Sequence, residues 1–104
     1  MKIGFLGPAG THSHECARAA FGDGEFVACA SISDVVALAA AGGAGVVPLE
    51  NSASGTVAQT LDAFVSGSDV SVAGCVLFAV RHALLSNSTT SRIARVYSHP
   101  EVTC

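Results

Sequence analysis

Two short turns in the sequence carry amide, hydroxyl and glycine residues in an order that suits the binding of a small anion. The first runs from Gly7 to Ser13, and the second follows an apolar stretch that ends at Pro48. Helix-forming residues follow each turn, and the first turn of a helix offers unpaired N–H donors and a partial positive charge. Together these features predict a carboxylate site. The candidate binding residues are Thr11, Ser13, Asn51, Ser52, Gly55 and Thr56.

Each turn also has a plain structural interpretation. Thr11 or Ser13 can cap the helix behind it, and Asn51 and Ser52 can serve as caps for a later helix. For the first turn alone, a capped connection between strand and helix is the better interpretation, because short motifs often match by chance. Gly4, Gly7 and Gly10 are spaced differently from the G-x-G-x-x-G of dinucleotide-binding proteins, so this cofactor class is not favoured.

The histidines and cysteines near the N-terminus raise the question of a metal site. His12, His14 and Cys16 lie close together in the sequence, but no second cluster completes a four-ligand set. We therefore expect solvated histidines at the start of a helix, with no metal and no cofactor. The four cysteines form no C-x-x-C pair and are expected to be small apolar residues or free thiols.

The elements that must position these turns alternate between strand and helix. Such alternation with short connections predicts an α/β fold with a largely parallel sheet. Ser31 and Asp34 have the spacing of a capping box at the start of the second helix. The apolar face expected for the third helix consists of Val57, Leu61, Phe64 and Val65. The expected strands are 2–6, 25–30 and 46–47, the expected helices 13–21, 35–41 and 55–65, and strand composition returns in 70–74, 75–80 and 92–97.

Composition narrows the function classes. Half of the 104 residues are hydrophobic, 12% are charged, and the net charge is −3. An acidic chain with so few basic residues is not expected to bind nucleic acid. Its apolar runs fall short of the roughly 18 residues that a membrane span needs, so we expect no membrane insertion and a cytoplasmic location. The excess of apolar residues predicts a surface covered by a partner, and a homo-oligomer is expected.

Several segments, taken in order, resemble the prephenate dehydratase family. Each segment alone is a modest match, but their order and spacing together cover nearly the whole chain. The matching segments are 7–13, 45–52, 55–57, 59–62, 80–85 and 96–100.

The resemblance implies a fold like that of the type II periplasmic binding proteins, in which two lobes hold prephenate between them. This chain would form an incomplete three-layer αβα lobe, with 1–76 as the first lobe and 77–104 as the hinge and the start of the second. The implied reaction converts prephenate to phenylpyruvate, carbon dioxide and water, in the biosynthesis of phenylalanine. Prephenate carries two carboxylates, which agrees with two anion-binding turns.

The resemblance also implies roles for single residues. The six candidate residues match the substrate-side motifs, and Ser98 matches a Ser-His-Pro turn of the family. The Thr-Arg-Phe motif, whose Thr is the implied proton donor, lies downstream in the family and is absent from these 104 residues. We therefore expect a truncated dehydratase, with no catalytic residue in this chain and doubtful activity by itself. Two alternatives remain open: a non-catalytic small-carboxylate binding or sensor module of the same fold, and a structural remnant.

Overall fold

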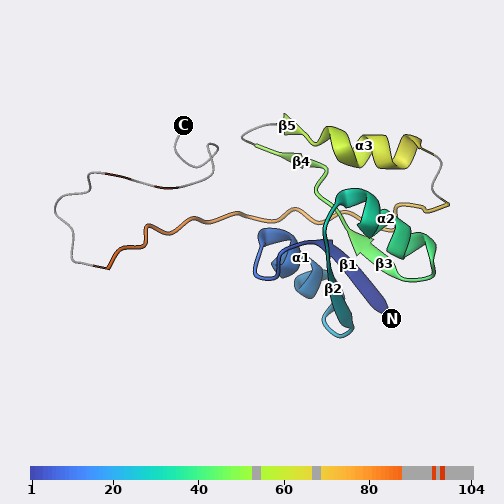
Figure 1. The fold of residues 1–104 in the computed structure, drawn as a ribbon, viewed down its shortest axis with the longest axis horizontal. Helices are drawn as coiled ribbons and strands as arrows, with labels where there is room; N and C mark the ends of the chain where they lie inside the picture. The colour runs from blue at the N-terminus through green and yellow to red at the C-terminus, as the bar shows by residue number, and fades with distance from the viewer. Residues whose placement is uncertain (53–54, 67–68, 88–94, 96, 98–104) are drawn as a thin grey trace.

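The computed structural model describes residues 1–52, 55–66, 69–87, 95 and 97. Strands and helices alternate through the first half of the chain, as the sequence predicts (Figure 1). In chain order the elements are β1 (Lys2–Leu6), α1 (His12–Phe21), β2 (Glu25–Cys29), α2 (Ile32–Ala40), β3 (Ala44–Val46), β4 (Glu50–Asn51), β5 (Gly55–Thr56) and α3 (Ala58–Val65).

The main sheet has three parallel strands in the order β2-β1-β3. The chain passes from β1 to β2 on one side and then crosses to β3 on the other side, so β1 lies in the centre. Ile3 pairs with Phe26 on one side and with Ala44 on the other. The prediction of an α/β fold with a parallel sheet is confirmed.

Alternate side chains of β1 enter two different cores. Ile3 and Phe5 are buried against Ala17 of α1. Leu6 packs on the opposite face, with Ile32 and Val36 of α2. Because successive side chains of a strand point to opposite faces, α1 and α2 must cover the two sides of the sheet. Figure 1 shows them on either side of β1, with α3 next to α2.

Glycines at the centre of the sheet let α2 approach closely. Gly4 pairs with Gly45 across β1 and β3. A Cβ atom on Gly45 would lie 2.7 Å from the Cγ1 atom of Val35, and one on Gly4 would lie 3.4 Å from Leu38. The sheet therefore presents a flat patch that accommodates the large side chains of α2.

The caps of the first two helices follow from local sequence. Thr11 accepts a hydrogen bond from the His14 amide at the start of α1, and Ser31 accepts one from the Asp34 amide at the start of α2. The predicted cap at Ser31 is confirmed. The helix behind it begins at Ile32, three residues before the predicted start, because the capped first turn is itself helical.

The predicted third helix is wrong at its start. It begins at Ala58, and Gly55 and Thr56 instead form β5, which pairs with β4 in an antiparallel hairpin. Gly55 has a φ of +75°, which a right-handed helix does not allow. The N-cap residue is Val57, which makes no side-chain cap, so the alternative interpretation of Asn51 and Ser52 as caps of this helix does not hold.

The buried face of α3 differs from the predicted apolar face. Thr60 and Ala63 are buried, whereas Leu61 and Val65 are exposed. Val57 and Phe64 do pack against the cluster formed with α2. The face of α3 that packs toward α2 therefore carries the small residues Thr60 and Ala63, while Leu61 and Val65 of the predicted face point away from the core.

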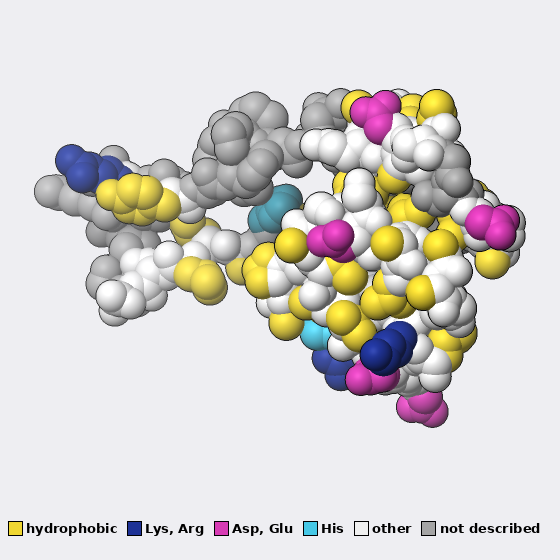
Figure 2. All heavy atoms as spheres, turned by 45° about the vertical axis from the view of Figure 1, so that its right-hand side comes forward, with side chains coloured by type: hydrophobic (Ala, Val, Ile, Leu, Met, Phe, Trp, Pro, Cys, Tyr) yellow, Lys and Arg dark blue, Asp and Glu magenta, His cyan; other side chains and the backbone are white. Residues whose placement is uncertain are grey.

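The strands predicted at 70–74 and 75–80 are absent, and residues 69–87 contain no helix or strand. Strand composition alone does not form a strand, because the backbone must pair with a neighbour. Val70 packs beside α2 and α3, but most later side chains are exposed. Figure 2 shows hydrophobic side chains spread along this extended part of the chain. The strand predicted at 92–97 lies largely outside the described residues.

In the described part of the chain, no helix has the length and apolarity needed to cross a bilayer.

Candidate functional site

Both turns predicted to bind an anion begin at the same edge of the sheet. β1 ends at Leu6 and β3 ends at Val46, and these two strands are parallel neighbours. The chain leaves β1 toward β2 on one side, while β3 lies on the other side. Such a reversal of strand order separates the two loops and creates the usual ligand-binding position of open α/β sheets. The sheet topology therefore places the starts of the two turns, after Leu6 and after Val46, at one edge of the sheet.

The first turn is fixed at both ends by hydrogen bonds. The Gly7 amide donates to the Cys29 carbonyl oxygen over 2.8 Å, and the Gly7–Pro8 peptide bond is cis. The Thr11 hydroxyl donates to the Leu6 carbonyl oxygen over 3.2 Å and accepts from the His14 amide over 3.3 Å. A hydroxyl has a single proton to donate, and here that proton is committed to the protein. Thr11 therefore caps α1 and also links the start of this helix to the end of β1.

Ser13 lies in the first turn of α1, where helix N–H groups have no intrahelical partner. Its side chain is half-buried. The Thr11 cap engages only the amide of His14. The amides of His12 and Ser13 precede that capped amide and belong to the first turn of α1, whose N–H groups have no intrahelical partner.

His14 was expected to be solvated, but its ring is engaged on two sides. The imidazole stacks on the ring of Phe5, with centroids 4.3 Å apart and planes within 1° of each other. Its Nδ1 atom accepts a hydrogen bond of 2.9 Å from the Gly10 amide. The sequence pattern gave no signal for this contact, and His14 was interpreted as a solvated histidine at the start of a helix.

His12 is exposed at the start of α1. Its ring meets that of His82 edge to face, with centroids 5.8 Å apart. Within the described residues, no group of three or more His, Cys, Asp and Glu side chains could hold a metal ion.

The second turn is the end of a hairpin. Asn51 pairs with Gly55 and Glu50 pairs with Thr56 in the antiparallel register. Asn51, Ser52 and Thr56 are exposed. The structure thus brings Asn51, Gly55 and Thr56 together at one hairpin, while Ser98 lies outside the described residues.

Two contacts that sequence reasoning missed attach this hairpin to α3. The Val57 amide donates to the Leu49 carbonyl oxygen over 2.8 Å. The buried hydroxyl of Thr60 donates to the carbonyl oxygen of Pro48. The exit from β3 and the first turn of α3 are therefore fixed to each other, which orients the hairpin between them. Thr60 falls within the segment 59–62 that resembles the family, but its type alone did not indicate this contact.

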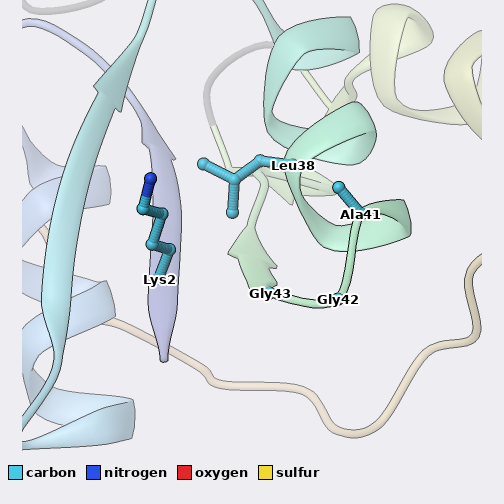
Figure 3. A pocket seen from close by; sticks show the side chains of 5 residues that line it. All are labelled: Lys2, Leu38, Ala41, Gly42 and Gly43. Atoms are coloured by element: carbon cyan, nitrogen blue, oxygen red, sulfur yellow. The ribbon is translucent and has the colours of Figure 1, made fainter.

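A separate shallow pocket lies at the opposite edge of the sheet. It has a volume of about 420 Å³ and is lined by Lys2, Leu38, Ala41, Gly42 and Gly43 (Figure 3). Lys2 begins β1 and Gly43 precedes β3, so this pocket lies at the amino ends of the strands. Parallel α/β sheets bind ligands at the carboxyl ends, and the candidate site is therefore the edge with the two turns.

Comparison with known protein families shows what this chain is similar to. Residues 3–103 match the family model of prephenate dehydratase. The chain belongs to the prephenate dehydratase family. The resemblance found in the sequence motifs is thereby confirmed.

Individual relatives of this chain support its assignment to the prephenate dehydratase family. The bifunctional chorismate mutase/prephenate dehydratase of Pseudomonas aeruginosa is 39% identical over 106 residues, covering 97% of this chain and 29% of the relative. The prephenate dehydratase of Lactococcus lactis subsp. cremoris is 35% identical over 103 residues, covering 97% of this chain and 37% of the relative. The chain therefore spans about a third of the length of these curated relatives.

The fold agrees with a solved member of the family. The X-ray structure of prephenate dehydratase from Streptococcus mutans aligns with a TM-score of 0.62 and 31% sequence identity. The alignment covers 66% of this chain and 37% of that chain.

Proposed function

We propose that this chain supplies the first lobe of a prephenate dehydratase (1–76), together with the hinge and the start of the second lobe (77–104). The observation that supports this proposal is the parallel pairing of β1 with β3, because the two turns proposed to bind anions start where these neighbouring strands end. The lobe is the type expected for a fold like the type II periplasmic binding proteins. The family match of residues 3–103 supports the same assignment.

In this proposal each turn receives one carboxylate of prephenate. At the first turn, the amides of His12 and Ser13 and the Ser13 hydroxyl meet a carboxylate at the N-terminus of α1, where the helix dipole favours negative charge. At the second turn, the Asn51 amide and the hydroxyls of Ser52 and Thr56 provide further donors.

Two residues of the proposed site act in a different manner. Gly55 has a φ of +75° and shapes the hairpin, and a Cβ atom there would contact nothing within 4 Å. This leaves open space for a ligand beside the backbone. Ser98 belongs to the proposed site through its family motif.

The proposed chemistry is a decarboxylative elimination. The ring carboxylate leaves as carbon dioxide, its bonding electrons complete the aromatic ring, and the ring hydroxyl leaves as water after it gains a proton. The two turns hold the substrate so that these bonds are aligned, which lowers the entropic part of the barrier. The implied proton-donor Thr belongs to the downstream part of the family's domain, so turnover needs that part as well.

The proposed setting is a homo-oligomer in the cytoplasm. Exposed apolar side chains support the homo-oligomer: Leu77 is fully exposed, and Leu85 is 88% exposed. Exposed apolar groups in such number are usually covered by a partner surface.

The experiment that tests the function compares the chain with a chimera. In the chimera, residues 1–104 replace the matching segment of the Lactococcus lactis enzyme, and phenylpyruvate formation from prephenate is followed. We expect turnover by the chimera and none by the chain alone. Asn51→Ala should raise the KM of the chimera, whereas Asn87→Ala, an exposed amide away from both turns, should leave it unchanged.

Three results would change the proposal. Equal effects of the two Asn substitutions would remove the second turn from the site. Prephenate binding by a folded chimera without turnover would favour the non-catalytic carboxylate-binding module. A folded chimera that neither binds nor converts prephenate would contradict the proposed function.

A further inference from the structure

The His14 side chain makes a hydrogen bond and a ring contact beside the first turn, and the proposed function assigns it no role. Its ring is held against the sheet by Phe5, which is buried near the carboxyl end of β1, the central strand. Phe26 of β2 lies on a second side, with ring centroids 6.2 Å apart and the planes tilted by 55°. Two aromatic neighbours on two strands therefore fix the position and the plane of the imidazole.

The fixed ring directs Nδ1 at the Gly10 amide, 2.9 Å away. An imidazole nitrogen accepts a hydrogen bond only when it carries no proton, so the neutral ring has its proton on Nε2. The contact thus selects one tautomer as well as one orientation.

Packing does not hold the turn at Gly10. This residue has a φ of +90°, and a Cβ atom there would contact nothing within 4 Å. The ends of the turn are fixed by the Gly7 amide and the Thr11 hydroxyl, while Pro8 and Ala9 between them are exposed. The bond from Gly10 to His14 is thus the contact that fixes the Ala9–Gly10 peptide unit, two residues before the helix begins at His12.

We propose that His14 is a positioning residue for the anion-binding turn. Its Nδ1 atom anchors the Gly10 amide and thereby sets where the next donors, the amides of His12 and Ser13, point. The consequence for prephenate rests on the proposed function, whereas the effect on the turn does not. Because the Gly10 amide is already occupied by the imidazole, a carboxylate at this turn is bound by the helix amides beyond it.

A set of matched substitutions distinguishes the effect of the hydrogen-bond acceptor of His14 from the effect of its aromatic ring. His14→Asn places an amide oxygen at the position of Nδ1 but removes the aromatic ring. His14→Gln carries the same amide one bond further out, near the position of Nε2. His14→Phe keeps a ring that can stack on Phe5 and has no acceptor. His82→Asn serves as the control, since His82 meets the ring of His12, which takes no part in the hydrogen bond between Gly10 and His14.

The measurements use the 104-residue chain labelled with ¹⁵N. In the native chain, ¹⁵N spectra should show Nδ1 of His14 without a proton and Nε2 with one. The Gly10 amide should keep its chemical shift and its slow hydrogen exchange in His14→Asn and His82→Asn, and lose both in His14→Gln and His14→Phe. Titration with prephenate should show about three- to tenfold weaker binding for the latter two, the factor expected for losing one hydrogen bond.

Each opposing result has a definite meaning. A proton on Nδ1 of the neutral ring, or equal Gly10 shifts in His14→Asn and His14→Gln, would overturn the positioning role. If His14→Phe binds prephenate as tightly as the native chain does, the proposed link to affinity is wrong. Failure of the native chain to bind prephenate would count against the proposed function, while the Gly10 and ¹⁵N data would still decide the role of His14 in the turn.

Discussion

The hydroxyl of Thr60 donates its hydrogen bond to the carbonyl oxygen of Pro48, twelve residues earlier in the chain. Thr60 is fully buried in α3, and Pro48 marks the exit from β3 toward the second of the two turns proposed to bind an anion. Proline has no N–H, so its carbonyl is the single backbone group that can make this connection. The bond couples the packing of α3 to the geometry of the proposed site.

Replacing that hydroxyl should destabilise the chain and disturb the second turn. Thr60→Val keeps the shape of the side chain but leaves the Pro48 carbonyl without its donor, which costs about 1–3 kcal/mol. Urea unfolding followed by circular dichroism measures the loss. Thr60→Ser keeps the donor and should lose less stability, and equal losses in the two variants would show that packing, not the hydrogen bond, is what matters.

The close approach of α2 to the sheet predicts a strong effect at Gly45. In Gly45→Ala the new methyl group would lie 2.7 Å from Val35 Cγ1 and 3.2 Å from the Val35 carbonyl oxygen. Overpacking of this kind costs about 1–3 kcal/mol. Gly74→Ala is the matched control, because a Cβ atom there meets nothing within 4 Å. Thermal unfolding of the two variants should differ clearly, and similar midpoints would contradict the packing described for α2.

The two hydrogen bonds of Thr11 predict a combined loss of stability and binding. Thr11→Ala removes the cap of α1 and the bond to the Leu6 carbonyl oxygen. The cap alone contributes about 1 kcal/mol. Thr11→Ser retains both groups and should restore most of the stability and the prephenate affinity. Chemical unfolding and prephenate titration on the same samples check this. A stable Thr11→Ala chain with unchanged affinity would remove Thr11 from the site.

Cys16 on α1 should be alkylated slowly, and its alkylation rate should rise at a higher pH than that of an ordinary thiol. Burial, and secondarily the nearby Cys75, raise the pKa of the Cys16 thiol. Since the thiolate is the reactive form, alkylation of Cys16 by iodoacetamide should become fast only at a pH above that of an ordinary thiol. The folded state disfavours this thiolate, so any contribution to stability is present at low pH and is lost as the pH rises through the raised pKa.

Peptide mass spectrometry after timed alkylation gives the rate at each pH. Cys75→Ser should move the Cys16 profile part of the way toward lower pH, because burial remains as the larger cause. An unchanged profile would show that Cys75 does not influence this thiol in solution.

The exposed apolar side chains of the extended segment predict self-association. Leu77 and Leu85 are both largely in solvent. Replacing both with Ser should lower the apparent mass in sedimentation velocity experiments toward that of a monomer. Leu61→Ser, a half-exposed position on α3, is the control. If the double substitution leaves the mass unchanged, this segment does not form the interface.

The sequence by itself determined the elements whose signals are local. Thr11 and Ser31 cap helices because each side chain reaches an amide three residues later, and Gly22, with a φ of +69°, ends α1. Such contacts lie within one turn of chain and can therefore be recognised from spacing. The family was likewise evident from ordered motifs.

Tertiary structure alone decided the features that join distant residues. The hairpin of β4 and β5 replaced the expected first turn of α3, because pairing of Asn51 with Gly55 competes with helix formation. The segment 69–87 has strand composition, yet no described strand pairs with it. The ring of His14 stacks on Phe5, and the hydroxyl of Thr60 donates a hydrogen bond to the carbonyl oxygen of Pro48. These contacts depend on where the sheet places each chain segment, which residue type and spacing do not specify.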